Sequence, residues 1–168
     1  MKKWIGMSVC AALVWVGTAN FSHAESRLGV GVNYWVTVDS VDVDDVDENG
    51  FSYYLSYQYR GDHLLGFQAD LELLPDRFGE DAWAPQAYLV LGKALYAAAG
   101  VGMVYTDGSF ADEPFFALKA GFDLEVFSGI YLDLNVNYRF NDKTDLEDSD
   151  SDIDTDTLFF GAALRFGF

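Results

Sequence analysis

The last eleven residues of the chain, LFFGAALRFGF (158–168), alternate strictly between two faces. One face is wholly apolar and runs from Leu158 to Phe168, whereas the other carries Arg165 and two glycines. A period of two residues with a continuous apolar face indicates a β-strand, because successive side chains of a strand point to opposite sides. This strand therefore needs an apolar environment on one side and tolerates a polar one on the other.

Seven further segments alternate in the same way, at 28–36, 51–59, 65–73, 87–91, 95–105, 116–124 and 130–140. Apart from the short segment 87–91, their lengths are close to the roughly 9–11 residues of a tilted transmembrane strand. The connections alternate between tight turns (61–62, 92–93 and 126–129) and long loops (39–50, 75–84, 106–113 and 141–156). The pattern predicts an all-β fold, an eight-stranded antiparallel up-and-down transmembrane β-barrel with its short turns in the periplasm.

The N-terminus has the features of an export signal. Lys2 and Lys3 precede an apolar run (4–16), and Ser22-His23-Ala24 offers a small-x-small cleavage site before Glu25. The apolar run is too short to span a bilayer as a helix. We therefore predict a signal peptide at 1–24 and an outer-membrane β-barrel domain at 25–168.

The face opposite the apolar one carries balanced charge. A soluble barrel of lipocalin type would turn its apolar face inward, whereas a membrane barrel turns its polar face toward the lumen. Equal numbers of acidic and basic residues fit a polar lumen in which charges pair, since an unpaired buried charge is costly. We predict a lumen ion-pair network of ten residues: Arg27, Arg60, Asp70, Glu72, Lys119, Asp123, Glu125, Asp133, Arg139 and Arg165.

Strand number, alternation and both chain ends resemble the small bacterial outer-membrane barrels, the OmpA/OmpX-like proteins of the porin family. The resemblance implies a location in the bacterial outer membrane, in contact with membrane lipid and lipopolysaccharide, and a monomeric state. It also implies that the terminal aromatic residues, Phe166 and Phe168, act as an insertion signal for the barrel-assembly machinery.

Negative charge is concentrated in the long loops, which hold 20 of the 27 acidic residues but only two basic ones. Such a field repels nucleic acid and attracts cations, so no nucleic-acid partner is expected. Five aspartates recur at every other residue of the last loop: Asp148, Asp150, Asp152, Asp154 and Asp156. They are candidate Ca²⁺ ligands, because Ca²⁺ prefers oxygen, although the spacing is not that of an EF-hand. A solvated acidic surface without a site is the other interpretation, and no other cofactor is expected.

No catalytic constellation is evident. Only one histidine, His63, remains after residue 24, and it follows a tight turn far from the long loops, so we expect no enzyme. An eight-stranded barrel has an interior that side chains just fill, and six aromatic residues are inward by parity: Tyr54, Tyr88, Tyr96, Phe115, Tyr131 and Phe159. The sequence predicts a structural or surface-interaction role with a plugged polar lumen and acidic extracellular loops. The alternative is a narrow, cation-preferring, porin-like channel.

Overall fold

A computed structural model describes residues 25–38, 49–61, 64–75, 81–106, 108–111, 113–144 and 153–168 of the chain. The side chains of 141–144 and 153–155 are not described. The predicted signal peptide (1–24) lies outside the described residues, so it remains a prediction. Among the described residues no helix is long and apolar enough to cross a membrane.

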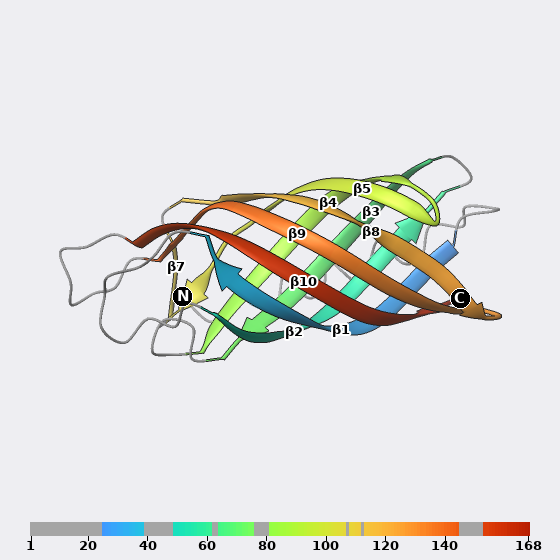
Figure 1. Cartoon of the computed structure of the whole chain (residues 1–168), viewed down its shortest axis with the longest axis horizontal. Helices are drawn as coiled ribbons and strands as arrows, with labels where there is room; N and C mark the ends of the chain where they lie inside the picture. Colours follow the sequence, from blue (N-terminus) through green and yellow to red (C-terminus); the bar gives the residue numbers. More distant parts are fainter. Residues whose placement is uncertain are drawn as a thin grey trace, which may run out of the picture.

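Eight long strands form one antiparallel sheet that closes on itself (Figure 1). They are β1 (Glu25–Thr37), β2 (Asn49–Arg60), β3 (Leu65–Leu74), β4 (Ala82–Gly92), β5 (Leu95–Gly102), β8 (Phe115–Phe127), β9 (Ile130–Thr144) and β10 (Ile153–Gly167). Neighbours in sequence pair with one another, β10 returns to β1, and the pairing of β3 with β4 completes the ring. The predicted eight-stranded antiparallel up-and-down barrel is therefore confirmed.

The fifth predicted segment, 95–105, is interrupted. β5 ends at Gly102, and the chain continues into a small hairpin formed by β6 (Tyr105–Thr106) and β7 (Ser109–Phe110). The backbone N–H of Met103 donates to the carbonyl of Pro85 over 3.2 Å. Because proline has no N–H to return to the ladder, regular pairing with β4 stops there.

The connections alternate in length as predicted. Short turns join β2 to β3, β4 to β5 and β8 to β9, and Gly92 and Gly129 have positive φ angles of 119° and 74° in the last two. The strand ends that the longer connections join lie at the opposite end of the barrel, hereafter the loop end. β9 and β10 are 15 residues each and extend into the segment predicted as loop 141–156. The start of β1 and the C-terminus both lie at the turn end (Figure 1).

The two faces of the sheet are inverted relative to a soluble protein. Outward apolar side chains are widely exposed, for example Leu55 at 56% and Leu118 at 55%, whereas the inward Asp133 and Arg165 are 0% exposed. An apolar surface of this extent requires a covering such as lipid. The inward-facing alternative, a lipocalin-type soluble barrel, is therefore wrong.

Glycine makes room for the large inward side chains. A Cβ on Gly31 would collide with the ring of Tyr54, and one on Gly100 would collide with the ring of Tyr88. Each pair joins neighbouring strands at the same register. All six aromatic residues predicted to point inward are buried, so the parity of the six strands that carry them was assigned correctly.

We expect the refolded protein in detergent to migrate differently before and after boiling, because a closed sheet has no free edge from which to unzip. Gel electrophoresis of unboiled and boiled samples measures this shift. A urea-unfolded sample serves as the control and should migrate like the boiled one. Full solubility of the folded residues 25–168 without detergent would contradict the membrane assignment.

Candidate functional site

The candidate site is the lumen, where nine of the ten predicted network residues converge from six strands. Asp123 on β8 is the centre of the turn end. Its carboxylate lies 2.6 Å from the guanidinium of Arg27, 3.4 Å from that of Arg60 and 3.9 Å from that of Arg165. One carboxylate thus connects side chains from β1, β2 and β10 across the barrel.

Two further carboxylates balance these arginines. Asp133 lies 2.8 Å from Arg165 and accepts a hydrogen bond of 2.7 Å from the Tyr96 hydroxyl. Glu25 lies 2.8 Å from Arg27, whose guanidinium carbon is 3.4 Å from the centroid of the Tyr131 ring. Three cationic and three anionic groups therefore neutralise one another at the turn end.

Lys119 occupies the middle of the lumen. Its ammonium group lies 2.9 Å from Asp70 and 4.2 Å from the centroid of the Tyr88 ring. The Gln68 amide donates to both oxygens of the Asp70 carboxylate, at 3.0 and 2.8 Å. Asp70 thus has an ion-pair partner and a hydrogen-bond donor, as a buried carboxylate requires.

Glu72 is the most connected carboxylate of the described lumen. It accepts hydrogen bonds from the amides of Asn33 and Gln86, at 2.6 and 2.8 Å, and from the hydroxyl of Ser52. The guanidinium of Arg139 pairs with it, and both side chains are only 1% exposed. One carboxylate therefore links β1, β2, β3, β4 and β9, so its removal should affect the whole ring.

Glu125 departs from the prediction. It is exposed, and its Oε1 accepts a 3.0 Å hydrogen bond from the backbone N–H of Gly129. It lies at the rim, where the register between β8 and β9 shifts after residue 125. Alternation predicts which side a strand residue faces, but it does not show where the lumen ends, so Glu125 belongs to the turn and not to the network.

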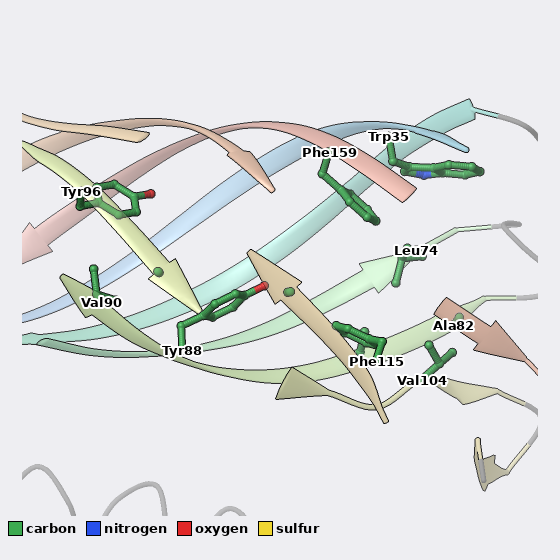
Figure 2. Close-up of a cluster of buried hydrophobic side chains, with 12 residues drawn as sticks. Trp35, Leu74, Ala82, Tyr88, Val90, Tyr96, Val104, Phe115 and Phe159 are labelled. Atoms are coloured by element: carbon green, nitrogen blue, oxygen red, sulfur yellow. The ribbon is translucent and has the colours of Figure 1, made fainter. Parts of the chain in front are cut away.

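Sequence analysis placed Phe115 and Phe159 inward, but it did not identify the apolar layer to which they belong. We call Trp35, Leu74, Val104, Phe115 and Phe159 the outer apolar layer; all five are at most 2% exposed. Figure 2 shows Trp35 and Phe159 on one wall and Leu74, Val104 and Phe115 facing them. The parity of Trp35 with the inward Asn33 was an available signal. Val104 lies outside the long strands, so no periodicity could have identified it.

The acidic loop residues are only partly described. Asp148, Asp150 and Asp152 lie outside the described residues, as does His63, and of Asp154 only the backbone is described. Asp156 is partly buried and accepts a 2.7 Å hydrogen bond from the hydroxyl of Tyr138. Within the part of the chain that the structure describes, no group of three or more His, Cys, Asp or Glu residues could hold a metal ion.

The C-terminal strand is paired to its end. The backbone N–H of Phe168 donates to the carbonyl of Ser26 over 2.9 Å. Phe166 and Phe168 are 53% and 77% exposed on the outward face. Both predicted insertion-signal residues are therefore accessible from outside the barrel, while their role as a signal remains a prediction.

A closed ring of eight antiparallel strands, with an apolar exterior and a charged, buried interior, defines the class of small transmembrane β-barrels. Comparison with solved structures agrees. The crystal structure of Neisserial surface protein A (NspA) matches with a TM-score of 0.59 and 16% identity, covering 88% of this chain and 98% of that one. The outer membrane protein AlkL, solved by solid-state NMR in DMPC bilayers, matches with a TM-score of 0.53 and 12% identity, covering 90% and 93%.

The N-terminal β-barrel domain of Pseudomonas aeruginosa OprF matches with a TM-score of 0.51 and 11% identity, covering 84% of this chain and 97% of that one. No protein-family model and no curated protein sequence matches the chain. At these identities the likeness shows the fold alone. That fold is the one of the small barrels of the bacterial outer membrane, and the apolar exterior of this chain suits that location.

The buried Glu72 should contribute strongly to the stability of the barrel. Changing Glu72→Ala leaves Arg139 buried without this carboxylate and should lower the free energy of unfolding by roughly 3–5 kcal/mol. The matched control is Glu125→Ala, an exposed carboxylate whose loss should stay within about 0.5 kcal/mol. Urea titration in detergent micelles measures both.

A double variant separates the effect of losing the whole ion pair from the effect of losing the carboxylate alone. Glu72→Leu with Arg139→Met removes both charges, and it should recover much of the loss because no charge is left unpaired. Equal stability of Glu72→Ala and Glu125→Ala would contradict a buried network.

Proposed function

We propose that the protein is an integral outer-membrane β-barrel with a plugged polar lumen and acidic extracellular loops, and that its role is structural or surface-interactive. It acts as a monomer and is not an enzyme. The observation that carries this proposal is charge pairing. Each of the five basic side chains of the lumen lies within ion-pair distance of a carboxylate, so none is left as a free site for a substrate.

Filling of the interior supports the plugged lumen. Tyr54, Tyr88 and Tyr96 are 5%, 1% and 2% exposed, and they lie among the ion pairs rather than against the wall of an open pore. An eight-stranded barrel is just wide enough to be filled by side chains. A filled lumen is therefore more consistent with a function of the outer surface than with transport through the barrel.

The exterior supports a membrane and lipopolysaccharide environment. Aromatic pairs lie on the loop-end half of the outer surface, with ring centroids 5.3 Å apart for Tyr34 and Phe51 and 4.7 Å apart for Tyr138 and Phe140. Amphipathic rings are enriched at the membrane–water interface. Beyond them the chain turns acidic, so contact with the anionic headgroups of lipopolysaccharide is expected to need bridging cations.

The exposed C-terminal strand supports recognition by the assembly machinery. β10 and the following Phe168 present Phe160, Leu164, Phe166 and Phe168 outward, each at least 46% exposed. This continuous apolar face of β10 is accessible before the strand pairs with β1. We include the barrel-assembly machinery as a partner on this basis, whereas the acidic surface disfavours nucleic acid.

The alternative, a narrow cation-preferring channel, is less well supported. The observation in favour of a channel is the acidic loop end, which would concentrate cations. Arg139, however, places a guanidinium between the rings of Phe115 and Phe159, at 4.8 and 3.9 Å from their centroids. Its partner Glu72 has both carboxylate oxygens bonded, so this part of the described lumen offers no free carboxylate to a passing cation.

Single-channel recording tests the proposal. The purified barrel in planar bilayers should show no stable open level in KCl, because the lumen is filled and its charges are paired. The same preparation must show the heat-dependent gel shift, which verifies that folded protein was added. A reproducible open level with cation selectivity would favour the channel instead.

The acidic loops are tested with Ca²⁺. If they bind Ca²⁺, the ion should protect loop 141–156 from protease and raise thermal stability, because a ligand of the folded state stabilises it by mass action. The triple change Asp150→Asn, Asp152→Asn and Asp154→Asn should abolish the effect, since amides lose the charge. Complete replacement of the Ca²⁺ effect by Mg²⁺ or NaCl at equal ionic strength would mean a diffuse acidic surface without a site.

A further inference from the structure

The lumen has two chemically different parts along its length. The outer apolar layer lies at the loop end: Leu74 is the last residue of β3, Phe115 is the first of β8, and Trp35 lies two residues before the end of β1. Charged residues follow toward the turn end, where Arg60 is the last residue of β2. A molecule that entered from the outside would therefore meet an apolar layer before any ion pair except that of Arg139.

The layer is tightly packed. A Cβ on Gly50 would lie 2.8 Å from the Trp35 ring, and one on Gly102 would collide with the Phe115 ring, so both rings rest on glycine backbone. Leu74 pairs across the sheet with Ala82, which is fully buried. The layer is closely packed at these positions, because each large side chain contacts a small neighbour.

The layer also includes a residue that does not come from a long strand. Val104 lies between β5 and β6, and its carbonyl accepts a 2.8 Å hydrogen bond from the N–H of Ala111. Its side chain is 2% exposed, inside the same apolar cluster as Trp35 and Phe159. Val104 thus belongs to the apolar layer although it lies outside the eight long strands.

Apolar constrictions stop ions in a way that ion pairs do not. A narrow apolar layer excludes water, and an ion that crosses it loses hydration without gaining a partner. The polar groups below the layer, in contrast, can exchange one partner for water at little cost when water reaches them. The two parts of the lumen therefore differ in what they can block.

We propose that the outer apolar layer alone seals the lumen, and that the ion-pair network beneath it stabilises the barrel without being the barrier. The protein is then a latent channel that one apolar layer keeps closed from the outside. This inference rests on the proposed plugged lumen, and it assigns the plug to five residues.

The experiment compares three variants in planar bilayers with the unchanged barrel. Trp35→Ser with Phe159→Ser makes the layer smaller and polar, and it should produce a stable open level. Trp35→Phe with Phe159→Leu keeps the layer apolar and should remain silent. Asp70→Asn with Lys119→Gln removes an ion pair of the network while keeping polar groups, and it should also remain silent.

The outcomes separate this inference from the proposed function. An open level in the unchanged barrel would contradict the plugged lumen itself. A silent barrel whose Trp35→Ser/Phe159→Ser variant is folded and also silent would overturn only the assignment of the seal. An open level in the Asp70→Asn/Lys119→Gln variant would overturn it as well, because the network would then be the barrier.

A further variant covers a failure of the serine variant to fold. Val104→Asp changes the layer without altering a long strand, and it should give the same open level, with folding verified by the heat-dependent gel shift. Thiol labelling is a second measurement, because residues 25–168 contain no cysteine. Ser56→Cys, a buried position on the lumen wall below the layer, should react with a water-soluble thiol reagent from the loop side only when the layer is polar. No increase in labelling of Ser56→Cys in the folded polar variants would overturn the proposal.

Discussion

Backbone hydrogen bonding is the constraint on which this structure depends. The hydrocarbon of a bilayer offers no water to unpaired N–H and C=O groups, so a sheet that crosses it must have no free edge. In this chain the ladder between β3 and β4, from Leu65 opposite Leu91 to Leu74 opposite Ala82, provides the closure. Once the ring is closed, every strand has an inside and an outside. The alternation of each strand then places apolar side chains toward lipid and polar ones in the lumen.

A closed polar lumen creates a second requirement, the pairing of charge away from bulk water. The network meets it with contacts between strands that are not neighbours. Arg27 reaches Asp123, 96 residues away, and Arg139 reaches Glu72, 67 residues away. Such contacts run across the barrel and fix its cross-section, whereas ladder hydrogen bonds fix only the neighbours of each strand. The network therefore stabilises the barrel over most of the length of the lumen.

The loop end of the lumen differs chemically from the ion-pair network. There the lumen becomes apolar, and the chain beyond it becomes strongly acidic. The guanidinium of Arg139, stacked against Phe159, marks the boundary between the two parts. A barrel with an acidic loop end and an interior whose basic side chains are paired is consistent with the proposed structural or surface role. The seal that we propose is the apolar layer, because it is the part of the lumen nearest to the outside.

The sequence by itself determined the architecture and the side to which most residues face. Alternation is a local property with a period of two, so Tyr88 and Lys119 could be placed inward, and Leu118 outward, without knowledge of any partner. The strand count and the alternation of short and long connections followed from the same pattern. Only the tertiary structure decided which charges meet, where the lumen ends and which apolar side chains gather at its loop end. The pairing of Lys119 with Asp70 depends on the diameter and stagger of the closed ring, to which all eight strands contribute. Glu125 lies beyond the end of the lumen, and Val104 enters it from a loop, because depth along the barrel and the path of a loop are set by contacts between distant segments rather than by local periodicity.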